Sequence, residues 1–86
     1  MNKIYLTGKI KSIRYGLVDK GKIYAIAILK LKIKNCKNYI MIICKNENAD
    51  FVYKYARENL SISLEGSLRQ IKNKYIVVVK LIESIF

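Results

Sequence analysis

The first part of the chain alternates apolar and polar residues with a period of two. In the segment 3–12 the apolar positions are Ile4, Leu6, Gly8 and Ile10. This pattern predicts a strand with one buried face, and Gly8 within it predicts a sharp bend or the close approach of another backbone. The alternation changes phase near Ile13 and Tyr15, which indicates a bulge there. Residues 16–22 contain two glycines and an aspartate and predict a hairpin loop.

The same alternation predicts two further strands. The segment from Ile23 to Ile33 is expected to form one long strand, and residues 35–38 form a turn that leads into a third strand at 39–44. The predicted buried face of the second strand consists of Ile23, Ala25, Ala27, Leu29, Leu31 and Ile33. The predicted buried residues of the third strand are Ile40, Ile42 and Cys44. The two alanines suit the interior of a narrow barrel.

A single helix is expected next, because apolar residues between Ala49 and Leu60 follow a helical spacing. Asn46 is a suitable N-cap for this helix, and acidic residues follow it in the first turn. Asn59 tolerates the left-handed conformation that closes a helix. Two more strands are predicted at about 60–70 and 75–83, joined by a short turn.

The predicted order is therefore β-β-β-α-β-β, in one domain that spans residues 1–86. Five strands with one helix between the third and the fourth is the order of the OB-fold, a small and partly open barrel. The sequence thus predicts an all-β protein with one helix. OB-folds commonly bind oligonucleotides through their strand faces and loops.

The charge of the chain favours a polyanionic partner. Lys and Arg total 17 against 6 Asp and Glu, which gives a net charge of +11. Such a field attracts nucleic acid or an anionic membrane surface. An A/T-rich coding sequence would also raise the lysine content, but it would not obviously lower the content of acids.

The residue inventory argues against several functions. The chain has no His, Trp or Pro, and its cysteines are Cys36 and Cys44, which do not make a convincing zinc site. Lys9, Lys11 and Arg14 interrupt every early apolar run, so no signal peptide is expected. No segment approaches the ~18 apolar residues that a membrane helix needs. No cofactor is expected. The carboxylates are scattered along the sequence, which argues against an enzyme. We expect a reduced, soluble, cytoplasmic protein.

Four segments of the chain resemble the bacterial single-stranded DNA-binding protein family (SSB). They are NKIYLTGKI (2–10), IRY (13–15), YAIAILKLK (24–32) and ADFVYKYARENLSISLEGSLR (49–69). The resemblance spans nearly the whole chain, and the EG-x-LR element at 65–69 is its most specific part. It implies an OB-fold that binds single-stranded DNA.

The chain also departs from that family. It has no tryptophan, and the aromatic position at the start of the third strand corresponds to Tyr39. A basic position of the family is Met41 here, and a later aromatic position is Lys45. The arm between the second and third strands is short, and we do not expect the disordered extension with an acidic tip that the family carries. The chain therefore resembles a PriB-like or mobile-element-encoded relative more than a full replicative SSB.

Single strands bind where cations for phosphates lie beside flat rings for unstacked bases. Tyr39 is the best stacking candidate, and the hairpin between the last two strands is one of the loops by which OB-folds grip nucleic acid. The predicted nucleic-acid-binding residues are Tyr39, Lys45, Tyr24, Lys30, Lys32, Lys34, Arg69, Lys72, Lys74, Tyr75, Lys3 and Arg14. Tyr53 and Tyr55 on the helix are expected to be structural.

Four aliphatic residues are predicted to face outward on neighbouring strands, namely Ile26, Ile28, Met41 and Ile43. Exposed apolar patches usually mark interfaces, so this set is a candidate interface of a homo-oligomer, either a dimer or a tetramer. Alternatively, the same side chains support bases in a monomer.

The leading hypothesis is a non-catalytic, largely sequence-independent single-stranded DNA-binding protein in DNA replication, recombination or mobile-element transfer. An RNA-binding OB domain is a second hypothesis, because no residue of the chain discriminates the 2′-hydroxyl. A third is a protein-interaction module that docks on a helicase, primase or other replication protein.

Overall fold

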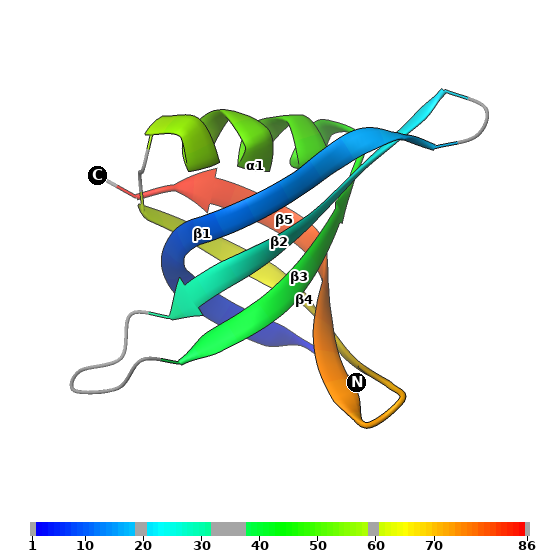
Figure 1. The fold of residues 1–86 in the computed structure, drawn as a ribbon. Coiled ribbons are helices and arrows are strands. Elements are labelled where there is room, and N and C mark those ends of the chain that lie inside the picture. The colour runs from blue at the N-terminus through cyan, green and yellow to red at the C-terminus, as the bar shows by residue number, and fades with distance from the viewer. Residues whose placement is uncertain (1, 19–20, 32–37, 59–60, 86) are drawn as a thin grey trace.

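The computed structural model describes residues 2–18, 21–31, 38–58 and 61–85. Five strands close into a barrel in the order β1-β2-β3-β5-β4, and α1 lies across one end of it (Figure 1). The elements are β1 (Ile4–Val18), β2 (Lys22–Leu31), β3 (Tyr39–Lys45), α1 (Glu47–Glu58), β4 (Ser61–Ile71) and β5 (Lys74–Ser84). The predicted OB-fold and its element order are confirmed.

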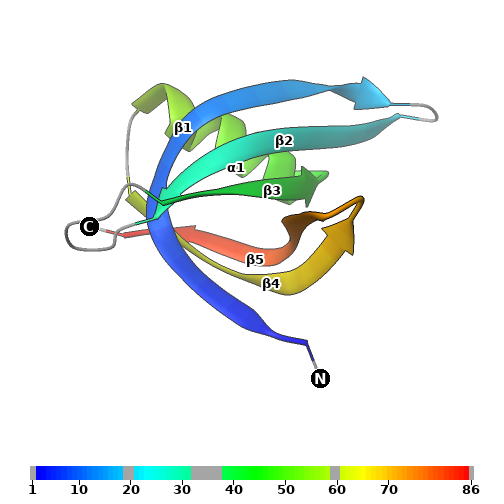
Figure 2. The ribbon, with the colours of Figure 1, turned by 60° about the horizontal axis from the view of Figure 1, so that its bottom comes forward.

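β1 is the longest strand, and its two halves pair with different neighbouring strands. Residues 4–9 pair with β4, and residues 8–18 pair with β2. Figure 2 shows the bend that β1 makes between these two partners. A Cβ atom on Gly8 would overlap the carbonyl oxygen of Lys30, so the predicted close approach of another backbone at Gly8 is confirmed.

The bulge in β1 lies between Ile10 and Ser12, where the register with β2 shifts by one residue. The predicted position near Ile13 and Tyr15 is therefore wrong by a few residues. Lys11 is the extra residue, and it comes just after β1 leaves β4 and continues along β2. The change of phase that is visible in the sequence at Ile13 is the downstream consequence of this insertion.

The core consists of the inward side chains of the strands together with one face of α1. Ala25, Ala27, Leu29, Ile42 and Cys44 are buried as predicted, and Ala49 and Val52 from α1 close the end of the barrel. Ile23, Leu31 and Ile40 are half-buried and pack against this cluster. The predicted inward faces of β2 and β3 are confirmed for these residues, while Ile33 lies outside the described residues.

Asn46 precedes α1, but its side chain does not cap the helix as predicted. Its carbonyl oxygen accepts a hydrogen bond from the Asp50 N–H at 3.1 Å. Its side-chain oxygen instead accepts from the N–H of Ile23, at 3.4 Å. Asn46 has a φ of +51°, which directs the side chain back to β2 and away from the helix. The residue therefore fastens the start of the helix to the barrel. The predicted closing residue Asn59 lies outside the described residues.

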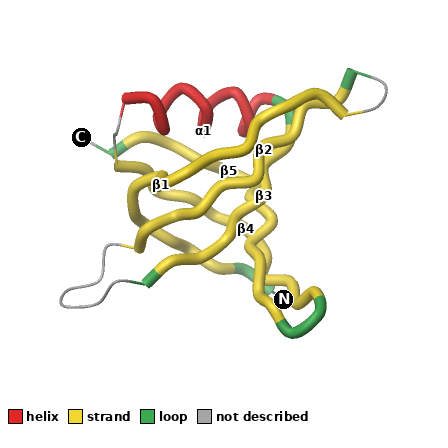
Figure 3. Tube along the Cα trace, in the orientation of Figure 1, coloured by secondary structure: helices red, strands yellow, loops and turns green. Residues whose placement is uncertain are grey.

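The β4–β5 hairpin projects beyond the barrel on the side away from α1 (Figure 3). Its two-residue turn consists of Lys72 and Asn73, with φ values of +46° and +67°. Two consecutive left-handed residues are typical of the tight turn that matches the twist of an antiparallel hairpin. The turn thus lies where the sequence predicts it.

Candidate nucleic-acid interface

The outward side chains of β2 and β3 form one surface, called here the β2–β3 face. Because paired residues lie on the same side of a sheet, the register orders this surface into rows that run across the strands. The paired residues of these two strands are Tyr24 with Lys45, Ile26 with Ile43, Ile28 with Met41, and Lys30 with Tyr39. The face therefore has an aliphatic centre, and a tyrosine beside a lysine lies at each end.

Tyr39 lies at one end of the β2–β3 face and points outward, with 42% of its surface exposed. Lys30 is its cross-strand partner. The ammonium of Lys11 lies over the Tyr39 ring, 4.4 Å from the ring centroid. The bulge in β1 thus brings a third strand into this corner. An exposed ring beside two cations can both stack on a base and attract its phosphate.

Tyr24 and Lys45 occupy the other end of the face. The Lys45 ammonium lies 6.0 Å from the centroid of the Tyr24 ring, at the outer limit of a cation–π contact. Tyr24 is half-buried, and Lys45 is exposed. This end therefore repeats the chemistry of the Tyr39 corner, with a less accessible ring.

The aliphatic centre consists of Ile26, Ile28, Met41 and Ile43, and we call it the aliphatic patch. Ile26 is 40% exposed and Met41 is 37% exposed, while the other two are half-buried. The outward orientation predicted for these four residues is confirmed. Arg14 on β1 pairs with Ile26 and therefore lies beside the patch.

The predicted binding residues of the β4–β5 hairpin lie on both sides of its two-stranded ribbon. Arg69 pairs with Ile76, and Ile76 pairs with Met41, which places Arg69 in a row of the β2–β3 face. Lys74 lies two residues before Ile76 and therefore on the same side of the ribbon. Tyr75 alternates with these residues and lies on the opposite side, with 58% of its surface exposed.

Lys3 lies apart from the other predicted residues. Its ammonium is 3.9 Å from the Glu65 carboxylate, on the β1–β4 side of the barrel. The neighbouring Asn2 side chain forms two hydrogen bonds with the backbone of Leu68, which extends the pairing of these strands. The contact of Lys3 with nucleic acid remains a prediction. Lys32 and Lys34 lie outside the described residues.

Lys9 and Lys11 were not among the predicted residues, although both lie beside this face. Lys9 pairs with Lys30, and Lys11 reaches Tyr39. The alternation in β1 already indicated that both lysines point outward. The sequence did not show that β1 passes beside this end of the face, because that depends on the exact position of the bulge.

Tyr15 and Tyr53 fasten α1 to β1. Their rings stack with centroids 4.5 Å apart, and the Tyr15 hydroxyl donates a hydrogen bond to the Asp50 carboxylate. This hydrogen bond raises the pKa of Tyr15, and desolvation raises it further. Phe51 and Tyr55 also pack together along the helix, with centroids 4.4 Å apart.

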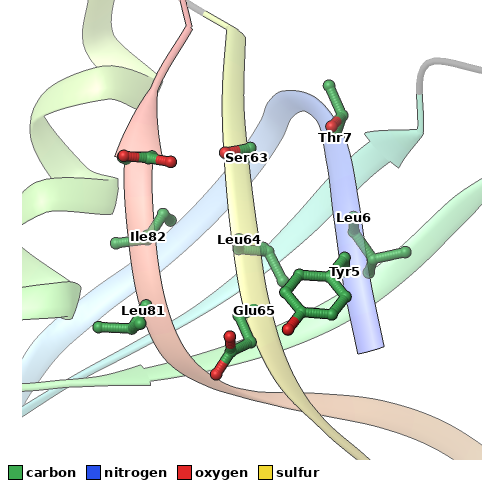
Figure 4. Close-up of a pocket in the computed structure, with 9 residues that line it drawn as sticks. Tyr5, Leu6, Thr7, Ser63, Leu64, Glu65, Leu81 and Ile82 are labelled. Carbon is green, nitrogen blue, oxygen red and sulfur yellow. The ribbon is translucent and has the colours of Figure 1, made fainter. Parts of the chain in front are cut away.

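A surface hollow lies between β1, β4 and β5, on the side of the barrel opposite the β2–β3 face (Figure 4). Its volume is about 310 Å³, and we call it the β1–β4–β5 groove. Tyr5 and Leu81 line it with 67% and 60% of their surfaces exposed. Glu65 and Glu83 add two carboxylates. This groove combines apolar and acidic groups, so it does not favour a phosphate backbone.

The described residues include no group of three or more His, Cys, Asp and Glu that could hold a metal ion. In the same part of the chain, no helix is long and apolar enough to cross a membrane. Cys44 is buried as a free thiol, and this burial raises its pKa to about 12. Cys36 lies outside the described residues.

The fold is similar to that of several solved proteins. The Thermus aquaticus single-stranded DNA binding protein, solved as a deletion mutant, superimposes with a TM-score of 0.88 at 14% identity. The match covers all of this chain and 42% of that one. The protein priB from Ralstonia solanacearum gives a TM-score of 0.80 at 12% identity, with 99% of each chain covered. The SSB domain of a Synechococcus sp. protein gives 0.79 at 15% identity, with 95% of this chain and 93% of that one covered.

No model of a known protein family and no curated protein sequence matches the chain. TM-scores of 0.79–0.88 establish a shared fold, and at identities of 12–15% they show the fold alone. They confirm the OB-fold that both the element order and the resemblance predicted.

Proposed function

We propose that this protein binds single-stranded DNA without catalysis and largely without sequence preference, in replication, recombination or mobile-element transfer. The observation that carries the proposal is the exposed ring of Tyr39 on the β2–β3 face, beside the cations of Lys30 and Lys11. Rings that stack on bases and cations that track the backbone are the two requirements for binding single strands. The names of the similar structures, which include single-stranded DNA binding proteins, support the same function.

In this proposal Tyr39 and Tyr24 stack on bases at the two ends of the face. Basic side chains contact phosphates. Lys30, Lys45, Arg14 and Arg69 lie in rows of the β2–β3 face, and Lys72 and Lys74 lie on the hairpin. Lys32 and Lys34, which lie outside the described residues, complete the proposed set. A net charge of +11 adds a long-range attraction. We expect the protein to act in the cytoplasm.

The test is the affinity for oligo-dT across a salt series, measured by fluorescence anisotropy of a labelled oligonucleotide. Each neutralised phosphate adds about −0.7 to the slope of log affinity against log salt on single strands. We therefore expect affinity to fall steeply with salt. Absence of binding at low salt, or binding that does not depend on salt, would refute the proposal.

Competition between oligo-dT and oligo-U in the same assay tests the choice of DNA over RNA. The β2–β3 face offers rings and cations, neither of which discriminates the 2′-hydroxyl. Displacement of oligo-dT by a lower concentration of oligo-U would assign the face to RNA.

As an alternative use of the centre of this face, we propose that the aliphatic patch is the interface of a homo-oligomer, in which case the strand contacts the ends of the β2–β3 face and does not cross its centre. Met41 and Ile26 expose apolar surface at its centre, and such surface is commonly covered by a partner. Sedimentation of wild type and of Ile26→Gln tests this proposal, since the variant is expected to dissociate. A wild type that is already a monomer at micromolar concentration would contradict it. If wild type is such a monomer and Ile26→Gln binds oligo-dT more weakly than wild type, the patch is assigned to the support of bases.

The β1–β4–β5 groove favours a second role, as a docking surface for a replication protein such as a helicase or primase. A segment that carries both basic and apolar residues would complement Leu81, Tyr5 and the Glu83 carboxylate, while Glu65 pairs with Lys3. Retention of a purified helicase or primase in the absence of nucleic acid, and its loss in Leu81→Gln, would support this role. Equal retention by the variant would contradict it.

A further inference from the structure

We propose that Lys9 and Lys30 bind one and the same phosphate group of the nucleic acid strand, and that they hold it next to Tyr39. The inference rests on the proposed function and adds a specific subsite to it. Its starting point is a single row of residues that crosses four strands. Ser61 on β4 pairs with Lys9 on β1, Lys9 pairs with Lys30 on β2, and Lys30 pairs with Tyr39 on β3.

The row passes over a hollow in the surface. A pocket of about 390 Å³ is lined by Lys9, Lys30 and Ser61, together with Gly8 and Leu31. Gly8 lies at the edge of this pocket, and its backbone packs directly against that of Lys30. Two lysines and a serine therefore line the pocket, and their side chains carry hydrogen-bond donors for an anion.

The arrangement of the two lysines is unfavourable without an anion. Lys9 and Lys30 lie directly opposite each other in an antiparallel pair, where like charges are destabilising. Within the described residues the only ion pair joins Lys3 and Glu65, so no carboxylate described here neutralises either lysine. A phosphate group between them would convert this repulsion into two charge-assisted hydrogen bonds.

The position of the pocket in the row supports a phosphate that belongs to a nucleotide. Tyr39 is the next residue of the row after Lys30, one strand spacing of about 4.8 Å away. Lys11 lies over the same ring. A base stacked at Tyr39 thus has a cationic pocket at its side, where the sugar can carry its phosphate. The phosphate is either an internal phosphodiester or the terminal phosphate of a strand.

The test compares the double variant Lys9→Gln/Lys30→Gln with wild type in the oligo-dT salt series. Lys54→Gln is the control for the loss of a lysine away from this face, since it removes one lysine from the exposed side of α1. If the two lysines share one phosphate, the double variant loses about 0.7 from the salt slope, whereas two separate phosphates would remove about 1.4. Over a fourfold change in salt, these values correspond to factors of about 2.6 and about 7.

Oligo-dT with a 5′-phosphate, with a 3′-phosphate and with neither distinguishes the two sources of the phosphate. A gain in affinity from one terminal phosphate in wild type, which disappears in the double variant, would identify a strand end. Equal binding of all three oligonucleotides, weakened in the double variant, would identify an internal phosphodiester.

Two results would overturn the inference. One is a double variant with the affinity and salt slope of Lys54→Gln, and the other is a loss of about 1.4 in slope. In both cases the proposed function stands if wild type binds oligo-dT and Tyr39→Ala weakens the binding. Failure of wild type to bind oligo-dT would instead refute the proposed function itself.

Discussion

Replacement of Tyr39 by alanine removes the ring on which the proposed interface depends. Stacking of a base on an aromatic side chain contributes about 1–3 kcal/mol by alanine substitution. A base on the face that Lys11 covers must displace a cation–π contact of about 0.5–1 kcal/mol at an exposed site. The difference spans about 0–2.5 kcal/mol. We expect a loss in the middle of this range, about 1–2 kcal/mol, which corresponds to an affinity lower by about 5- to 30-fold.

The assay is a titration with oligo-dT at fixed low salt, followed both by anisotropy and by tyrosine fluorescence, because the chain has no tryptophan. Tyr39→Phe keeps the ring and is expected to keep the affinity. Tyr5→Ala is the matched control, since Tyr5 is more exposed than Tyr39 but lies in the β1–β4–β5 groove. Equal affinities of Tyr39→Ala and Tyr5→Ala would refute the assignment of Tyr39.

Three further predictions concern the fold that positions the interface. Gly8→Ala is expected to destabilise the protein by about 1–3 kcal/mol in urea unfolding, because the new Cβ would overlap a backbone carbonyl of β2. Gly16→Ala, whose Cβ meets nothing within 4 Å, should cost nothing, and equal losses in both variants would contradict the explanation. The pKa of Tyr15 is higher in the folded than in the unfolded protein, because its hydroxyl donates a hydrogen bond to Asp50. This hydrogen bond therefore stabilises the fold fully below about pH 10, and its contribution is lost as the pH rises through the pKa of the folded protein. Urea unfolding as a function of pH should show this loss in wild type and not in Tyr15→Phe. Cys44 is buried and has a pKa of about 12, so in a Cys36→Ser background it should react with a thiol reagent only when the protein unfolds. Fast reaction of the native Cys36→Ser protein would contradict the burial of Cys44.

The sequence predicted the barrel well because its alternation is strict. Ala25, Ala27 and Leu29 on β2 are buried as expected, and the outward residues between them form the β2–β3 face. A period of two assigns each side chain to a face without any knowledge of neighbouring strands. The outward orientation of Tyr39 followed from the same rule.

Features that depend on which strands are neighbours could not be predicted in this way. The contact between Lys11 and Tyr39 requires both the bulge and the path of β1 beside β2. The ion pair of Lys3 requires the pairing of β1 with β4. Tyr75 was grouped with Arg69 because both lie near the hairpin turn, but the pleat places them on opposite sides of the ribbon.

The most direct test of the binding surface is a titration of the ¹⁵N-labelled protein with oligo-dT, followed by amide chemical shifts. If the strand crosses the β2–β3 face, the largest changes will occur at Lys9, Lys30 and Tyr39, while Tyr5 and Leu81 will remain unaffected. Changes confined to the β1–β4–β5 groove, or the absence of changes at saturating oligo-dT, would contradict the proposed interface.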